Sequence, residues 1–283
     1  MPNESISSAG PAILGAIKTC PCCAGNAFKF SPALWPELIE EWQLSPAEAD
    51  YTNRQQGFCC KSCGCNLRSM TLARALLGAF GFGGTLSDFT LDSQHRSLNI
   101  LELNGAGQLT QFFDGKFAPK THNSSPSSVK DILRQVPGMW RIVPPAARRR
   151  KVIPMPGHVT GEYPEVDMTK LPYANASFDV VLHSDTLEHV SDPLLGLKEC
   201  RRVLRRGGFL CFTIPIIVDR STMSRAGMPA SYHGIPGSAN GADLKVWTEY
   251  GADFWKQMFE AGFFEFRAVS LEYPSSIAIV GVG

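Results

Sequence analysis

Residues 171–215, LPYANASFDVVLHSDTLEHVSDPLLGLKECRRVLRRGGFLCFTIP, hold the pattern that decides the fold. Within them, Phe178–Leu182 is apolar apart from one aspartate, which is typical of a strand buried on both faces. Pro193 opens a helix with an apolar stripe, and Gly207-Gly208 is predicted to end it. Phe209–Ile214 then has the pattern of a second buried strand. A strand, a helix and a strand in about forty residues make a βαβ unit, so the core sheet should be mainly parallel.

The same stretch resembles the class I S-adenosylmethionine-dependent methyltransferases, in the branch with a type 11 methyltransferase domain. That branch carries LPF-x-x-x-SFD, then L-EHV, then E-x-x-RVL-x-x-GG. The chain matches it at Leu171–Tyr173, Ser177–Asp179, Leu187–Val190, Glu199, Arg202–Leu204 and Gly207-Gly208. So many matches at fixed spacing are more specific than a lone glycine loop. The resemblance implies a doubly wound α/β fold, with a mainly parallel Rossmann-like sheet and an antiparallel edge strand, and S-adenosylmethionine as cofactor.

Length and charge exclude several classes of function. The chain has 283 residues with 27 basic and 26 acidic side chains, so its net charge of +1 gives no general attraction to nucleic acid or anionic membranes. Its apolar runs are far shorter than the roughly 18 residues that span a bilayer. The first residues lack the basic segment of a signal peptide. We therefore expect a cytoplasmic protein with no membrane partner, whose nine cysteines do not form a disulfide framework.

The sequence divides into three predicted parts. Residues 1–18 are a flexible leader, residues 19–70 a small cysteine-rich module and residues 71–283 the methyltransferase-like domain. Residues 216–247 are rich in Gly, Ser and Pro, and a loop of this length is typical of a substrate lid. Within the domain we expect helices over Met70–Phe80, Gln108–Phe113 and Tyr250–Ala261, a loop over Gly81–Ser97, and strands at Leu98–Leu103, within Lys151–Thr160, and as an antiparallel pair at Phe264–Val269 and Ser276–Val282.

The turn after the first strand is the predicted donor-binding loop. Glu102, Asn104, Gly105 and Gly107 lie there, and small residues let the backbone approach a ligand at the carboxyl end of a strand. By the resemblance, this loop holds the methionine portion of S-adenosylmethionine. The family usually has E-x-G-x-G-x-G, whereas here Asn104 and Ala106 stand where glycines are expected. The two glycines are each displaced by one position.

Further residues are expected around the nucleoside. Glu162 is the candidate for the end of the second strand, where a carboxylate has two oxygens to accept from both ribose hydroxyls. By the resemblance, Asp167 accepts the exocyclic amine of adenine and Met168 covers a face of the ring. Ser184, at the end of the strand that begins at Phe178, completes the predicted cofactor site. Without the surrounding signature, Glu162, Asp167 and Met168 would be interpreted as loop caps or solvated side chains.

His183, Asp185 and His233 are the candidate catalytic residues. Transfer of a methyl group from a sulfonium is an in-line displacement, which needs an aligned nucleophile and a dry site. A hydroxyl or amine nucleophile also gains from a positioned base. His183 and Asp185 end a strand where the methyl group should lie, although both could instead cap the following turn. His233 follows Tyr232 in the long loop, which suits a base on a lid, although a lone loop histidine is more often solvated.

Cys20, Cys23, Cys60 and Cys63 are the predicted metal ligands. They form two C-x-x-C pairs, and four thiolates at such spacing suit tetrahedral zinc. An iron–sulfur cluster, redox-active thiols or unligated cysteines remain as alternatives. Three more thiols leave the choice of ligands open: Cys22, Cys59 and Cys65.

Taken together, these features predict transfer of a methyl group to a small-molecule or sugar-like metabolite, with O-methylation preferred over transfer to nitrogen or carbon. The rival is an RNA methyltransferase, because some ribosomal-RNA guanine methyltransferases join a zinc module to this type of domain. Residues 19–70 contain four basic and five acidic side chains, which leaves no electrostatic footprint for phosphate, and only the run Arg148–Lys151 is strongly basic. A third hypothesis is a non-catalytic relative in which Asn104 and Ala106 fill the donor pocket. The sequence fixes neither the acceptor nor the oligomeric state.

Overall fold

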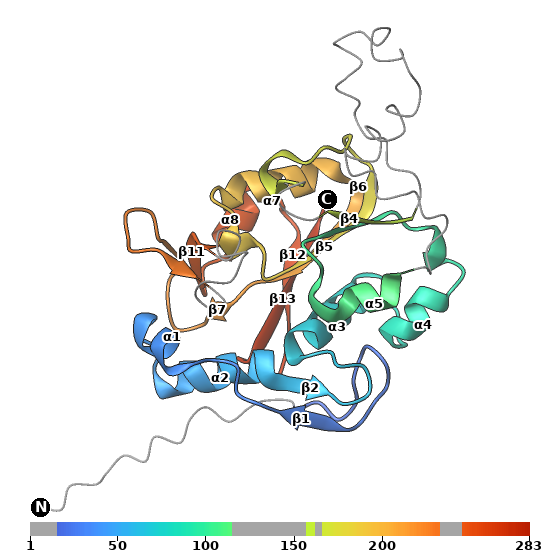
Figure 1. Ribbon diagram of the computed structural model, residues 1–283. Coiled ribbons are helices and arrows are strands. Elements are labelled where there is room, and N and C mark those ends of the chain that lie inside the picture. The colour runs from blue at the N-terminus through green and yellow to red at the C-terminus, as the bar shows by residue number, and fades with distance from the viewer. Residues whose placement is uncertain (1–15, 115–156, 162–165, 233–244) are drawn as a thin grey trace, which may run out of the picture.

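A central sheet organises the computed structural model, which describes residues 16–114, 157–161, 166–232 and 245–283 (Figure 1). Its strands are β3 (Ile100–Leu103), β4 (His158–Gly161), β5 (Phe178–Ser184), β6 (Leu204–Thr213), β12 (Phe266–Leu271) and β13 (Ser276–Val282). They lie in the order β12-β13-β6-β5-β3-β4. Neighbours from β4 to β6 pair in parallel, whereas β13 runs antiparallel to both β6 and the edge strand β12. The predicted Rossmann-like sheet is confirmed, with its antiparallel strand one place in from the edge.

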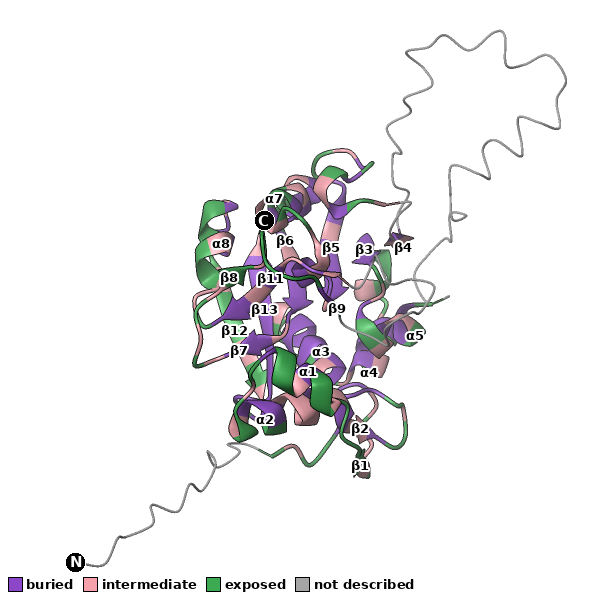
Figure 2. Cartoon of the chain, turned by 60° about the vertical axis from the view of Figure 1, so that its left-hand side comes forward, coloured by how far each residue is buried: buried purple, intermediate pink, exposed green. Residues whose placement is uncertain are grey.

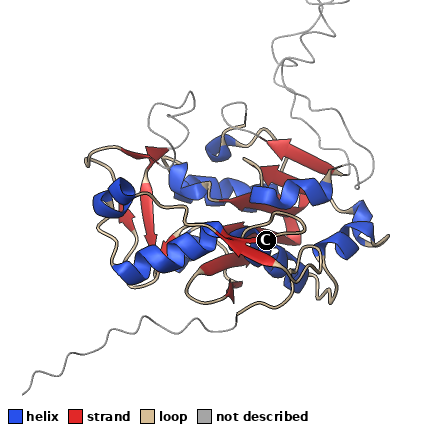
Figure 3. Ribbon diagram, turned by 60° about the horizontal axis from the view of Figure 1, so that its bottom comes forward, coloured by secondary structure: helices blue, strands red, loops and turns tan. Residues whose placement is uncertain are grey.

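Helices cover both faces of this sheet (Figure 3). The longer ones are α3 (Leu67–Ala79) on one face and α7 (Pro193–Val203) with α8 (Trp255–Glu260) on the other. Because successive strand residues point to opposite faces, Val180 and Leu182 pack on the α3 side and Val181 packs on the α7 side. The inner strands are buried on both faces, as their apolar run predicts (Figure 2).

The βαβ unit has one difference from the sequence-based prediction, at the end of its helix. α7 begins at Pro193, after an Asp192 side chain that accepts the backbone N–H of Leu195. It ends before the glycine pair, which lies inside β6. A Cβ added to Gly208 would lie only 2.8 Å from the carbonyl oxygen of Asp179. Gly208 is therefore needed where β6 passes close to the backbone of β5, whereas a Cβ at Gly207 would meet nothing within 4 Å, and the helix ends without either glycine.

Two other segments depart from their predicted structure. The predicted loop Gly81–Ser97 contains α4 (Leu86–Leu91), which begins with a reciprocal capping box between Thr85 and Asp88. The predicted helix Tyr250–Ala261 is helical only over α8, because its first residues belong to β11 (Thr248–Gly251). Tyr250 pairs there with Ile216, and no local sequence pattern predicts this partner.

The N-terminal region packs directly on the sheet domain. Its elements are β1 (Phe28–Phe30), α1 (Pro36–Glu41), α2 (Pro46–Gly57) and β2 (Phe58–Cys60). Cys20 and Cys60 belong to the same buried cluster as Val180 and Val280 of the sheet. Glu272, between β12 and β13, accepts the N–H of Ile17 at 3.0 Å and pairs with Arg54. The predicted boundary between residues 70 and 71 falls within α3.

The segment after β6 forms short strands beside α1 and α2. They are β7 (Ile216–Ile217), β8 (Met223–Ser224), β9 (Ser231–Tyr232), β10 (Lys245–Val246) and β11. Residues 233–244, and with them His233, lie outside the described residues, as do Glu162, most of the predicted leader and the basic run Arg148–Lys151. Among the helices that are described, none has both the length and the apolar character needed to cross a membrane.

Asp179 anchors the amino end of β5, so Asp179→Ala is expected to destabilise the fold by about 1–3 kcal/mol. Its carboxylate accepts the backbone N–H of Asn99 at 2.8 Å and pairs with Arg205. The affinity for a ligand at the other end of the strands should not change. Arg205→Ala is the control, because loss of an ion pair with a half-exposed arginine should cost less than about 1 kcal/mol. Urea unfolding of both variants measures their free energies of unfolding. Equal losses in Asp179→Ala and Arg205→Ala would contradict the role given to the hydrogen bond with Asn99.

Candidate functional site

The side chain of Glu102 holds the loop after β3 in its conformation through hydrogen bonds. One carboxylate oxygen accepts the N–H of Ala106 and the hydroxyl of Thr110, and the other lies 2.6 Å from Nε2 of His158. Burial alone would raise the pKa of Glu102, but these hydrogen bonds outweigh it and the pKa is lowered. The side chain is 0 % exposed. Glu102 therefore shapes the loop and presents no exposed atom to a ligand.

The two departures from the family's glycine pattern are both compatible with the backbone conformation of the loop. Asn104 has a φ of 51°, in the left-handed region that a glycine would occupy and that asparagine tolerates better than most residues. Ala106 has a φ of −81°, which any residue can adopt, and its side chain packs into the core beneath the loop. Gly105 and Gly107, at φ of 62° and 61°, provide the remaining left-handed positions. The loop therefore reaches a glycine-like path with a different spacing of glycines.

Gly107 marks where three parts of the chain meet. A Cβ added there would lie 2.7 Å from Oγ of Ser69, 3.6 Å from Oγ of Ser184 and 3.9 Å from Nη2 of Arg68. Ser184 ends β5, and its hydroxyl lies 2.8 Å from that of Thr213 on β6. The loop after β3, the start of α3 and the carboxyl end of β5 thus converge, and a role of the loop and of Ser184 in binding the cofactor stays a prediction.

Asp185 follows β5 and is held by the N-terminal region. Its carboxylate pairs with the guanidinium of Arg68, and it accepts a hydrogen bond from Nε2 of Gln56 at 3.0 Å. The Thr213 hydroxyl lies 3.4 Å from its other oxygen. The side chain is largely buried, so an acceptor would have to displace Arg68 or Gln56 to reach it. A catalytic role for Asp185 stays a prediction under that condition.

His183 is a core residue, contrary to the prediction of a catalytic role. Its side chain is 0 % exposed, and its ring stacks on that of Phe212 with centroids 4.6 Å apart. Burial lowers the pKa of His183 to about 3, so the ring is neutral. Because alternate strand residues face opposite sides of the sheet, this position points into the packed layer beneath α7 rather than toward the donor loop.

The predicted adenine contacts lie beyond the carboxyl end of β4. Val166 packs over Gly161, within 3.0 Å of the Cβ that a larger residue would carry. Asp167 is exposed, and one of its oxygens caps a short turn by accepting the N–H of Thr169 at 2.8 Å. Met168 is 4 % exposed and packs against α7 at Gly196. Asp167 is free to take a second role, whereas Met168 contributes mainly to the core.

Several side chains at this site were not predicted from the sequence. Gln56 comes from α2, and Arg68 and Ser69 come from the first turn of α3. Gln56 and Asp185 are 129 positions apart, a distance over which no local pattern operates. Glu188 is wholly buried beside them, and burial, followed by the charge of Asp185, raises its pKa well above the usual value.

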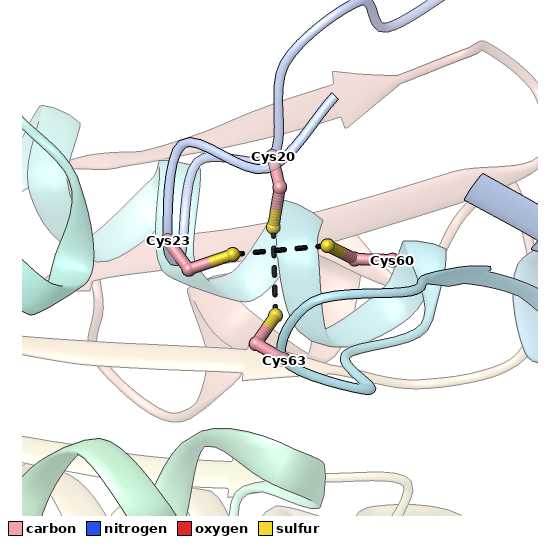
Figure 4. Close-up of side chains that lie close together, drawn as sticks. All are labelled: Cys20, Cys23, Cys60 and Cys63. Carbon is pink, nitrogen blue, oxygen red and sulfur yellow. Dashed lines mark hydrogen bonds between the residues drawn. The ribbon is translucent and has the colours of Figure 1, made fainter. Parts of the chain in front are cut away.

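The four predicted metal ligands come together as one cluster. The sulfur atoms of Cys20, Cys23, Cys60 and Cys63 all lie within 4.8 Å of one another. Figure 4 shows them pointing at a common centre, with Cys20–Cys63 and Cys23–Cys60 separations of 3.7 Å. Tetrahedral zinc with Zn–S bonds of about 2.3 Å requires sulfur separations of about 3.8 Å. The donor set fits such an ion, and the other three nearby thiols lie outside this group.

Arg220 ties the segment after β6 to the N-terminal region. Its guanidinium contacts both oxygens of Glu48, at 2.7 and 2.8 Å, and also the carbonyl oxygens of Trp42 and Gln43. The indole N–H of Trp42 in turn donates to Oγ of Ser231 at 2.9 Å. Arg220 and Ser231 of the predicted lid are therefore hydrogen-bonded to α2 and to the turn that follows α1.

The Arg220–Glu48 pair should make stability depend on pH. Hydrogen bonds from Arg220 lower the pKa of Glu48 to about 2, so the pair stabilises the fold fully above the unfolded pKa of about 4.3. That contribution is lost as the pH falls through the folded pKa. Glu48→Gln should cost about 1.5–3 kcal/mol at neutral pH, with a smaller difference from the wild type in acid. Glu37→Gln, at an exposed site on α1, is the control. A difference in unfolding free energy between Glu48→Gln and the wild type that stays constant with pH in urea unfolding would contradict this prediction.

A pocket of about 410 Å³ lies elsewhere, around the carboxyl end of α7. Arg201 and Arg202 line it, but they already donate to the carbonyl of Gly262 and to Glu199. It includes none of the loop, Asp185 or the cysteines, so we do not associate it with the candidate site.

Comparisons with known proteins bear on the matched signature. Residues 142–212 match the model of a methyltransferase domain. The chain is 40% identical over 63 residues to a probable S-adenosylmethionine-dependent methyltransferase of Mycolicibacterium smegmatis, covering 20% of this chain and 24% of that protein. It is 40% identical over 57 residues to a ubiquinone biosynthesis O-methyltransferase of Cereibacter sphaeroides, covering 20% of this chain and 23% of that protein. The chain thus spans about a quarter of the length of these curated relatives.

A solved structure from Thermotoga maritima, of a SAM-dependent methyltransferase and possible histamine N-methyltransferase, is also similar. It is 18% identical, covers 74% of this chain and 93% of its own, and has a TM-score of 0.35, too low to bear on function. The family match, in contrast, covers most of the βαβ unit, and it confirms the resemblance drawn from the signature.

Proposed function

Because the chain carries a class I S-adenosylmethionine-dependent methyltransferase domain, we propose that it transfers a methyl group from S-adenosylmethionine to a small-molecule or sugar-like metabolite. The observation that carries the proposal is the loop Glu102–Gly107, with left-handed backbone at Asn104, Gly105 and Gly107, at the carboxyl ends of parallel strands, which is where ligands bind in such sheets. Oxygen is the proposed acceptor atom, and the O-methyltransferase names among the relatives support that choice.

Each residue of the site has a definite task in this proposal. The donor supplies an electrophilic methyl group, so the protein needs to bind it, orient the acceptor and exclude water. Gly105 and Gly107 let the backbone approach the donor, and Glu102 keeps the loop in that shape. Glu162 for the ribose and Asp167 for the adenine remain proposed contacts. Asp185 is the proposed residue nearest the acceptor, and His233, outside the described residues, remains a candidate base.

We also propose that Cys20, Cys23, Cys60 and Cys63 bind zinc. Four thiolates complete a tetrahedral ion and leave no open position, which is typical of a structural site. Such a site suits a reducing compartment, and we place the protein in the cytoplasm on that ground. The RNA alternative gains no support from the described residues, because Arg54 and Arg68 of this region pair with Glu272 and Asp185.

Calorimetric binding of S-adenosylhomocysteine to the zinc-loaded protein tests the proposed function, with a nicotinamide dinucleotide as the control ligand. We expect micromolar binding of the first ligand alone. A folded, metal-replete sample that binds neither ligand would favour a non-catalytic protein with the same fold. Retention on RNA at moderate salt would favour the RNA methyltransferase instead.

A further inference from the structure

The cysteine cluster and the donor loop are joined by hydrogen bonds from two glutamines. Gln108 and Gln111 follow Gly107 directly, on a short 3₁₀ turn (Gly107–Leu109) and α5 (Thr110–Phe113). Nε2 of Gln111 donates to the carbonyl oxygen of Cys63 at 3.2 Å and to that of Gln108 at 2.7 Å. Cys63 is one of the four clustered thiols. Gln111, in the short helix that follows the loop, is therefore hydrogen-bonded to the backbone of a predicted metal ligand.

Gln108 makes a second set of contacts, to the residues just after the cluster. Its Oε1 accepts the hydroxyl of Ser69 and lies 3.4 Å from the backbone nitrogen of Asn66. Its own backbone N–H donates to Oγ of Ser69 at 3.3 Å. Asn66 caps α3 by accepting the N–H of Ser69 at 2.9 Å. The second cysteine pair, the start of α3 and the end of the donor loop thus form one connected network.

This network also reaches the point of closest approach in the loop. Ser69 is the side chain that a Cβ at Gly107 would meet first, and Arg68, its neighbour, pairs with Asp185. Both follow the second cysteine pair by only a few residues. The position of α3's first turn depends on where that pair is held, since Cys60 and Cys63 must close on Cys20 and Cys23 from a distant part of the chain.

We propose that the metal bound by the four cysteines positions the donor loop through Gln108 and Gln111, so that metal binding and donor binding strengthen each other. This inference rests on the proposed function, since it requires a donor site. With metal bound, the second cysteine pair is fixed and the two glutamines hold the loop ready for the ligand. Without these hydrogen bonds, the loop becomes ordered only when the donor binds. The free energy needed to order the loop then lowers the affinity for the donor. Both glutamines are positioning residues, because neither is argued to touch the reacting atoms.

The first test replaces the two glutamines in the zinc-loaded protein. Gln108→Ala and Gln111→Ala should each retain a full complement of zinc and weaken S-adenosylhomocysteine binding about 5–10-fold, since one or two hydrogen bonds are lost. Gln108→Glu should recover part of the affinity, because a carboxylate oxygen can still accept from Ser69. Gln94→Ala, at an exposed position away from the loop, is the matched control. Wild-type affinity in both alanine variants would overturn the proposal.

The second test uses the reciprocity of coupled binding. If metal strengthens donor binding, the donor must strengthen metal binding by the same factor. Saturating S-adenosylhomocysteine should raise the chelator concentration that removes half of the zinc by about 5–10-fold in the wild type, and by less in Gln108→Ala. Equal zinc retention with and without the ligand would overturn the coupling while leaving the proposed function intact. A zinc-loaded wild type that does not bind the ligand would remove the proposed function and this inference together.

Discussion

Replacing Gly107 with alanine is expected to weaken S-adenosylhomocysteine binding at least about 30-fold in a protein that still folds. The new methyl group would lie 2.7 Å from Oγ of Ser69, closer than real Cβ contacts allow. Ser69 cannot move freely, because its hydroxyl is bonded to Gln108 and its N–H to Asn66. The loop must shift instead, toward the space in which the donor is proposed to bind. Calorimetry on the zinc-loaded variant measures the effect.

The chain offers a matched control for the cost of the backbone conformation. Gly207 has a φ of 76°, and a Cβ there would meet nothing within 4 Å. Alanine at either position should cost about 1–2 kcal/mol of stability, because both adopt the left-handed conformation. Only Gly107→Ala should also lose donor affinity. Equal donor affinities in the two variants would show that the crowding at Ser69 has no bearing on the ligand.

Removal of the Glu102 carboxylate should have the largest effect on stability of any single change at this site. Glu102→Ala leaves the N–H of Ala106, the Thr110 hydroxyl and the ring of His158 without their shared acceptor. Loss of one partner from a buried charged network costs about 3–5 kcal/mol, so we expect a loss of this size in urea unfolding. Donor binding should fall below detection, because the loop loses the side chain that closes it.

The same carboxylate predicts the direction of a pH effect. Since the folded pKa of Glu102 is lowered, its contribution to stability is present above the unfolded pKa of about 4.3 and lost as the pH falls through the folded value. Glutamine at position 102 keeps the shape of the side chain but not its charge. The difference in unfolding free energy between Glu102→Gln and the wild type should therefore become smaller in acid. A loss below about 1 kcal/mol for Glu102→Ala, with unchanged donor affinity, would remove Glu102 from the account of the loop.

The parts of the fold that follow from the sequence are those with a strong local pattern. The run Phe178–Leu182 predicts its strand because both faces are buried, and Pro193 predicts the start of α7 because its ring suits the first turn. The Gly207-Gly208 pair misled the prediction of the helix end, since both glycines lie inside β6, where Gly208 allows a close approach to the carbonyl oxygen of Asp179. Tyr250 has helical surroundings in the sequence, but its pairing with Ile216 overrides them.

The candidate site was predictable to the extent that its residues follow strands. The glycine loop and the cysteine pairs have recognisable spacing, and the structure brings each of them together. Gln56 and Arg68 could not be found in this way, because they reach Asp185 from helices more than a hundred positions earlier. His183 shows the opposite failure. A titratable residue at a strand end suggested chemistry, while the ring is buried against Phe212.

The contacts of Glu272 with Ile17 and Arg54 have a consequence for the synthesis of the chain. The side chain that fastens the N-terminal region is translated 255 residues after its partner Ile17. Strand β13, which covers the same buried cluster as Cys20 and Cys60, is made later still. At ribosomal rates of about 5–20 residues per second, the delay is on the order of 10–50 s. During that interval, β13 does not yet bury the cysteine side chains of the nascent chain. Binding of a metal ion by the four cysteines needs no residue beyond Cys63, so it is the first protection of these thiols to become available.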